Sequence, residues 1–199
     1  GLVGATDGDV DIITSFNKGA ISNSQNSLTS SISVGGLVGK ESVTTSKYLN
    51  ITNSYNNGDI ILNASTNNVD VRAGGILGSA DSIRSGSSLV NYFKFKYVYN
   101  AGDFSVTGYS SASNRSVYVA GLVGFADRPV NVFTNDSLIS YAFNVGDLVS
   151  LDGSSRITSI GSRLHFREIM GTTISSYTAT GVSQNDVYYD YDAPYQIFY

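Results

Sequence analysis

The chain has no cysteine, two prolines and a single histidine among its 199 residues. The absence of cysteine excludes disulfides, thiolate zinc sites, iron–sulfur clusters and catalytic thiols. With so little proline beside 21 glycines, collagen-like chains, proline-rich linkers and mucin-like stalks are also excluded. The hydrophobic fraction of 41% is sufficient for one sizeable core, so we expect one domain or one repeat array.

Positive charge is scarce as well, with 12 Lys and Arg against 16 Asp and Glu and a net charge of −4. Nucleic-acid binding is not expected, because a basic surface is needed to neutralise phosphates. No apolar run approaches the roughly 18 residues of a membrane-spanning helix, so membrane insertion is not expected either. Abundant Ser, Thr, Asn and Tyr without Cys are typical of secreted bacterial β-proteins, which favours an extracellular, secreted or surface-anchored location.

What the sequence does contain is an internal repeat. The block Val-Gly-Gly-Leu-Val-Gly at 34–39 recurs, with small changes, at 73–78 and 119–124, and residues 1–4 are its truncated tail. A decayed copy at 159–164 keeps one central glycine. The central glycines at 1, 36, 75, 121 and 161 predict a unit of roughly 40 residues. A start inside a repeat motif suggests flanking domains of a longer chain.

A second block alternates with the first. It reads Ser-Tyr-Asn-Asn-Gly-Asp at 54–59 and recurs at 98–103 and 142–147, with a shorter copy at 15–19 and a weaker one at Tyr177 and Gly181. Apolar and polar residues alternate before the Gly-Gly pairs, as at 69–73 and 117–119, which is the period of a strand with one buried face. No helical stripe competes with this pattern.

These features predict an all-β fold, specifically a β-solenoid (β-helix-like) of about five repeats over residues 1–183, with 184–199 as a C-terminal strand or cap. We expect two coils per repeat and a rod of about 45 Å at the cross-β spacing. Stacked coils bring equivalent residues into columns, aliphatic in one case and aromatic in another. The residues expected to repeat structurally are Gly36, Leu37, Gly39, Gly75, Ile76, Gly78, Gly121, Leu122, Gly124, Phe16, Tyr55, Tyr99, Phe143, Gly58, Gly102 and Gly146.

The glycines and asparagines have expected roles within the stack. Glycine either adopts positive φ at a corner or leaves room for a neighbouring backbone. Asn56, Asn100 and Asn144 are placed to form a ladder of side-chain amides. Segment length varies most after the glycine block, so 40–48, 79–88 and 125–136 are predicted loops on one side, where binding is expected.

The alternation of a Gly-Gly-Leu-Val-Gly block with a Ser-Tyr-Asn-x-Gly-Asp block resembles the GLUG-motif repeat family. That resemblance covers essentially residues 1–183, and residues 185–190 look like the terminal strand that follows such repeats. Members occur in large secreted or wall-anchored bacterial proteins, including adhesin-like proteins and the non-catalytic parts of IgA1-specific metallopeptidases. The resemblance implies an extracellular repeat scaffold without one fixed ligand. The fourth copy departs from the pattern, since Arg163, His165, Arg167 and Glu168 intrude.

The sequence contains no established catalytic or metal-binding motif among those considered. His165 lies in His-Phe-Arg-Glu, which is not the His-Glu-x-x-His arrangement of zinc peptidases, and no Gly-x-Ser-x-Gly elbow is present. Asp59, Asp103 and Asp147 offer a glycosidase-like carboxylate pair or calcium ligands, but their recurrence in every repeat favours turn structure. We therefore expect no catalytic residues, no enzyme activity and no cofactor, with calcium as a minor alternative.

The function expected from these observations is a non-catalytic adhesion or spacer module that binds a host glycoprotein or polysaccharide. Two alternatives stay open. One is a domain that positions substrate for an IgA1-protease-like metallopeptidase, and the other is a polysaccharide-active β-helix.

Overall fold

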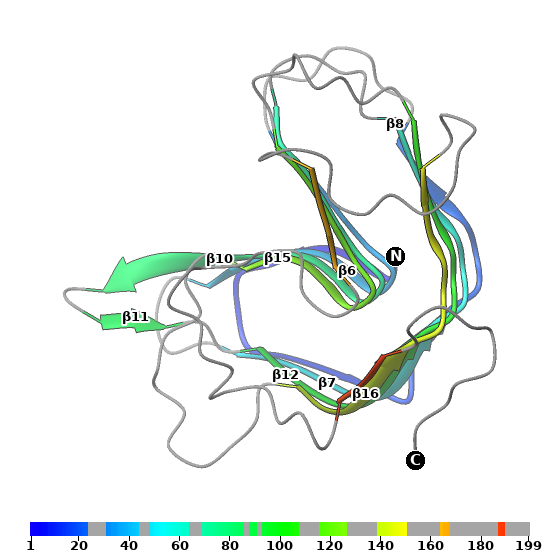
Figure 1. Cartoon of the computed structure of the whole chain (residues 1–199). Helices are drawn as coiled ribbons and strands as arrows, with labels where there is room; N and C mark the ends of the chain where they lie inside the picture. Colours follow the sequence, from blue (N-terminus) through cyan, green and yellow to red (C-terminus); the bar gives the residue numbers. More distant parts are fainter. Residues whose placement is uncertain are drawn as a thin grey trace.

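The computed structural model describes residues 1–23, 31–43, 48–63, 69–85, 88–90, 93–107, 116–126, 139–150, 164–167 and 187–189. Within these ranges the chain forms strands and no helix. Strands pair in parallel, apart from one antiparallel hairpin, and they form four long sheets. The predicted all-β class is thus confirmed, and the parallel sheets are consistent with a β-helix-like fold (Figure 1).

The four sheets are named A to D in the order in which the chain visits them. Sheet A contains β1 (Val3–Thr6), β6 (Val38–Val43), β10 (Leu77–Ser85) and β15 (Val123–Ala126). Sheet B contains β2 (Val10–Ile13), β3 (Phe16–Asn17), β7 (Leu49–Asn56), β12 (Phe93–Asn100), β16 (Ile139–Asn144) and β19 (Val187–Tyr189). Sheet C contains β4 (Ile21–Ser22), β8 (Ile60–Asn63), β13 (Phe104–Thr107) and β17 (Leu148–Ser150). Sheet D contains β5 (Ile32–Gly35), β9 (Val71–Gly74), β14 (Val117–Ala120) and β18 (Leu164–Arg167).

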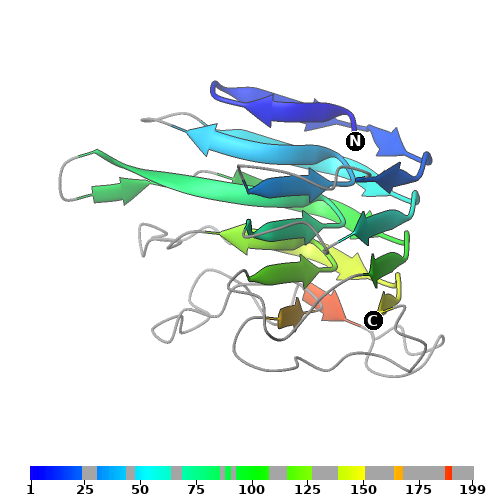
Figure 2. The ribbon, with the colours of Figure 1, turned by 90° about the horizontal axis from the view of Figure 1, so that it is seen from above.

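Each sequence repeat makes a single pass through the four sheets. The register pairs Val3 with Val38, Val38 with Leu77 and Leu77 with Val123, so neighbouring strands are one repeat apart (Figure 2). The expectation of two coils per repeat is therefore wrong, because the short strands of one repeat all belong to one coil. Sheet B, with five strands along its main path, spans about 19 Å rather than 45 Å at the usual strand spacing.

Two apolar clusters hold the coils together. The first lies between sheets A and B and includes Leu37, Ile76 and Leu122, each fully buried, as the repeat places them. The second lies between sheets C and D and includes Phe104 and Val117. Both clusters run along the stack: the first draws on the first four repeats and the second on the first three, within the residues whose burial is described.

The segments predicted as loops begin as strands. Residues 79–85 extend β10, which folds back onto β11 (Ser88–Val90) as an antiparallel hairpin that projects from the stack (Figures 1 and 2). Its register pairs Ile83 with Val90. Residues 40–43 likewise belong to β6, and Phe125 and Ala126 end β15. Residues 44–47 and 127–136 lie outside the described residues.

The C-terminal part continues sheets D and B. Leu164 lies opposite Val117 and Arg167 lies opposite Ala120, the residue just before the Gly121 turn. Tyr188 lies opposite Phe143, which makes 187–189 a further strand of sheet B. Gly161, Tyr177 and Gly181 lie outside the described residues.

Candidate functional site

In each coil the asparagine side chain packs against the glycine turn, as Asn56 does against Gly36 and Asn100 against Gly75. Asn17 donates its side-chain amide to Asn56, Asn56 to Asn100 and Asn100 to Asn144, at Nδ2–Oδ1 distances of 2.8, 2.7 and 2.7 Å. Asn56, Asn100 and Asn144 are buried. Each also donates to the carbonyl of the glycine two residues later, which fixes the corner between sheets B and C. The predicted amide ladder is therefore present.

The glycines of the turn between sheets D and A leave space for this asparagine corner. A Cβ on Gly75 would collide with the carbonyl oxygen of Gly121 and with the side chain of Asn100, and Gly36 meets the equivalent atoms of Gly75 and Asn56. None of the glycines described in this way has φ in the positive range. Of the two expected roles, close backbone approach is the one that the structure supports.

The recurring aspartates bind backbone between coils. Asp59 accepts a hydrogen bond from the Asp103 amide at 3.1 Å, and Asp103 accepts one from the Asp147 amide at 2.8 Å. All three side chains are exposed. Across the described ranges, no group of three or more His, Asp or Glu side chains is placed to hold a metal ion. Asp59 and Asp103 therefore stabilise the turn of the following coil.

The four repeated aromatic residues form one column on the outer face of sheet B. Ring centroids are 5.3 Å apart from Phe16 to Tyr55, 4.8 Å from Tyr55 to Tyr99 and 5.0 Å from Tyr99 to Phe143, with planes within 11° of parallel. Phe16 is 51% exposed, and the other three are half-buried. The column exists, but it faces outward. Since the rings cover one another's faces, it presents mainly ring edges to solvent.

A backbone irregularity places a second aromatic pair beside this column. Thr14, Asn53, Tyr97 and Tyr141 occupy the same position in successive coils, and all have φ between 50° and 56°. The left-handed region suits Asn but costs about 1–2 kcal/mol for most other residues. Register pairing skips the position, because Lys96 pairs with Thr52 and Val98 with Ser54. The chain therefore holds two tyrosines in a conformation that they disfavour.

These two tyrosines are exposed, and a lysine ammonium lies over their rings. Tyr97 and Tyr141 are 49% and 44% exposed, and their rings stack at 4.8 Å with planes 23° apart. Lys96 places its ammonium 5.2 Å from the Tyr97 centroid and 5.9 Å from that of Tyr141. Within the described chain Lys96 makes no ion pair with a carboxylate. We refer to Lys96, Tyr97 and Tyr141 as the tyrosine–lysine patch.

Two phenol groups on or beside this face have shifted pKa values. Desolvation, followed by the neighbouring Tyr55, raises the pKa of Tyr99 above its ordinary value. Tyr48, at the edge of the face, also has a raised pKa, chiefly because its hydroxyl donates to Asp11 at 3.2 Å. Both phenols are therefore neutral hydrogen-bond donors at physiological pH.

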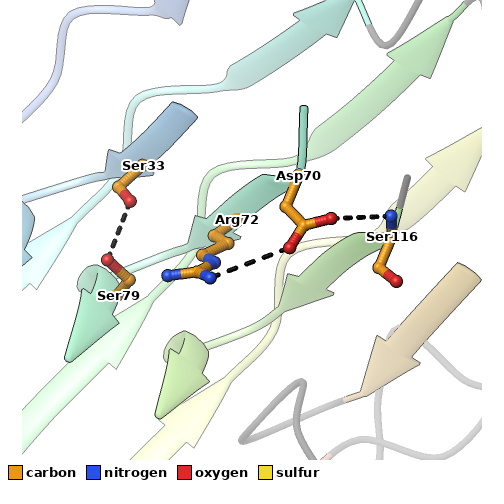
Figure 3. A network of polar contacts seen from close by, with 5 residues as sticks. All are labelled: Ser33, Asp70, Arg72, Ser79 and Ser116. Carbon is orange, nitrogen blue, oxygen red and sulfur yellow. Dashed lines mark hydrogen bonds and ion pairs between the residues drawn. The ribbon is translucent and has the colours of Figure 1, made fainter. Parts of the chain in front are cut away.

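A separate polar network ties sheet A to sheet D (Figure 3). The hydroxyls of Ser33 and Ser79 are 2.7 Å apart, and Arg72 pairs with Asp70 at 3.7 Å. Asp70 also accepts a hydrogen bond from the Ser116 amide at 2.9 Å. The Arg72 guanidinium lies 3.9 Å from the centroid of Phe125, a β15 residue. These contacts are partly buried and connect four coils, so we assign them a role in stability.

Residues singled out near the C-terminus are placed only by their backbone. His165 and Arg167 belong to β18, where His165 pairs with Tyr118, and Arg163 and Glu168 lie outside the described residues. The tyrosine–lysine patch was not foreseen from the sequence. Its residues precede the aromatic block by one or two positions, and the left-handed position varies from Thr to Asn to Tyr, so no shared residue type marks it.

Comparisons with known proteins add no assignment: no family model, no curated protein and no solved structure matches the chain. Among the described residues there is no helix long and apolar enough to cross a membrane.

Proposed function

We propose that the chain is a β-solenoid of about five repeats, of the GLUG-motif kind, and that it serves as a non-catalytic adhesion or spacer module of a bacterial surface or secreted protein. The observation that carries this proposal is the outer face of sheet B, where four successive coils present stacked rings at one outward position. Such a face is built by repetition, as an extended contact surface is, whereas a catalytic site needs a unique cluster in one coil.

The partners that fit this proposal are a host glycoprotein or a polysaccharide, together with flanking domains of a longer chain. A broad, exposed face of rings, amides and hydroxyls suits a long ligand that makes many weak contacts. The projecting β10–β11 hairpin offers a second place for contact. We assign the protein no cofactor and place it outside the cell.

The test is a binding screen of the purified protein against host glycans and immunoglobulins, with and without EDTA. A variant with residues 84–89 removed separates the hairpin from sheet B. Binding to a glycan or glycoprotein supports an adhesion module, and loss of binding on trimming places the contact on the hairpin. Binding to immunoglobulin alone favours the alternative of a substrate-positioning domain. Cleavage of any panel member by the purified protein would contradict the non-catalytic proposal.

A further inference from the structure

We propose that the tyrosine–lysine patch binds an acidic polysaccharide, with Lys96 contacting a carboxylate and Tyr97 and Tyr141 contacting the sugar rings and hydroxyls. This inference rests on the proposed function and names its ligand class and site. The patch lies on the outer face of sheet B, beside the aromatic column.

The first argument is the backbone conformation of the two tyrosines. Tyr97 and Tyr141 have φ of 56° and 50°, whereas the same position in the preceding coil is occupied by Asn53, a residue that adopts this conformation readily. Residues held in disfavoured conformations concentrate at functional sites. Two strained and exposed tyrosines in consecutive coils therefore indicate that their rings are retained for contact rather than for stability.

The second argument is the charge at the patch. Although the chain has a net charge of −4, Lys96 is exposed, and its ammonium is held beside both tyrosine rings. Lys94, two residues earlier on the same strand, is also exposed. A carboxylate that reaches Lys96 gains a charge-assisted hydrogen bond, which is stronger than a neutral one. The patch is thus complementary to an anionic ligand.

The third argument selects a polysaccharide over an acidic peptide. Peptides that bind sheets usually pair with a free strand edge. Here β12 pairs with β7 on one side and β16 on the other, so the strand that carries Lys96 and Tyr97 has no free edge. β16 pairs with β19 from Ala142, the residue after Tyr141. Tyrosine rings and hydroxyls instead match the alternating apolar faces and hydroxyls of sugars.

The test uses titrations with three carboxylated polysaccharides, namely polygalacturonate, alginate and hyaluronate, at low and raised salt. Fully methyl-esterified polygalacturonate is the neutral control for the ligand, and poly-glutamate is the acidic peptide. The variants are Lys96→Gln and the pair Tyr97→Asn with Tyr141→Asn. Lys18→Gln is the matched protein control, because Lys18 lies at the same 5.2 Å from a ring, that of Phe16, at the far end of the other column.

We expect at least one carboxylated polysaccharide to bind, with an affinity that falls as salt is raised, and the methyl ester to bind at least about tenfold more weakly. Lys96→Gln and the double tyrosine variant should each weaken binding about tenfold or more, whereas Lys18→Gln should not. The double variant should melt within about 4 °C of the wild type, since asparagine relieves the backbone strain.

Binding of none of the three polysaccharides, or binding that the patch variants leave unchanged, would overturn the assignment. Equal binding of poly-glutamate would do so as well, because it would reduce the site to general charge attraction. If the patch assignment is overturned but the protein still binds in the glycan and immunoglobulin screen, the proposed function stands. Failure of the patch assignment and failure of the proposed function are therefore distinguishable.

Discussion

At the residue scale, the two sequence blocks are the two halves of one contact. The glycine turn has no side chain because the asparagine ladder and the next coil occupy the space, as the contacts around Gly36 and Gly75 show. In each coil the asparagine side chain donates hydrogen bonds to the glycine carbonyl of its own turn and to the asparagine side chain of the next coil, as Asn56 does. Repetition of both blocks in phase is therefore a packing requirement, and single substitutions test it.

The close approach of backbone predicts a position-dependent cost for glycine substitution. Gly78→Ala places a methyl group against the carbonyl of Gly39 and 2.6 Å from the Val34 amide nitrogen, so we expect a loss of about 3 kcal/mol or more in unfolding free energy. Gly4 occupies the same motif position in the first coil, with nothing within 4 Å. Gly4→Ala should change stability by less than about 0.5 kcal/mol. Urea denaturation of both variants checks this, and equal costs would contradict the packing role.

The amide ladder predicts a similar gradient from its middle to its end. Asn100→Ala removes hydrogen bonds to Asn56, Asn144 and Gly102 and leaves buried groups unsatisfied, which should cost about 3 kcal/mol. Asn17→Ala, at the partly exposed end, should cost about 1 kcal/mol. Thermal and chemical unfolding measure both values. A cost for Asn100 no greater than that for Asn17 would mean that the ladder contributes little.

The aromatic column predicts a loss of stability in alkali. Because the folded-state pKa of Tyr99 is raised, folding favours its neutral form, and the associated stability is complete below the unfolded pKa of about 10. It is lost as the pH rises through the folded pKa. Melting temperatures from pH 8 to pH 11.5 should therefore fall less steeply for Tyr99→Phe than for the wild type. Parallel curves would exclude a contribution from this phenol.

At the element scale, the repeats made the strands and the columns predictable, but they did not show which way each column faces. In β7, Leu49 and Ile51 are buried, and so are Ser54 and Asn56. The left-handed residue Asn53 adds one position to the alternation, and this moves Tyr55 from the inner face to the outer. The varied residue types at that position hide the irregularity from the sequence, so ring burial could not be derived.

The β10–β11 hairpin could not be predicted for a related reason. Residues 79–88 are mostly small and polar, without the apolar alternation that marks strands. The backbone pairing nevertheless continues from sheet A, with Asp81 opposite Ser42 and Ser82 opposite Val43. The first strand of the hairpin is thus an extension of a sheet A strand, and its pairing with β6 of the neighbouring coil holds it extended.

The position of the hairpin predicts that its tip is dispensable for folding. Pairing with β6 ends at Ser82, so removal of residues 84–89 leaves all inter-coil pairs of sheet A intact. We expect the trimmed variant to melt within about 4 °C of the wild type. Removal of residues 79–82 should instead destabilise strongly, because Ser79 and Ala80 pair with coils on both sides. Calorimetry on the two deletions distinguishes a projecting element from a structural one.

At the scale of the whole molecule, one repeat corresponds to one coil, and the columns along the stack follow from that. Columns of rings, amides and aspartates arise because equivalent residues lie one strand spacing apart, about 4.8 Å. The same stacking gives the outer face of sheet B its regular pattern, on which the proposed binding of a polysaccharide depends.

Cysteine cross-linking tests this claim most directly, since the chain has no cysteine of its own. Ser22, Ile61 and Ser105 are register partners in three successive coils of sheet C. With one coil per repeat, Ile61→Cys with Ser105→Cys places two cysteines within the distance that a disulfide spans, so mild oxidation should link them. Ser22→Cys with Ser105→Cys separates them by two coils, about 9.6 Å, beyond the roughly 7 Å limit between Cα atoms. Efficient cross-linking of the first pair and not the second is the predicted result, and the reverse pattern, or failure of the first pair in a folded protein, would contradict the account.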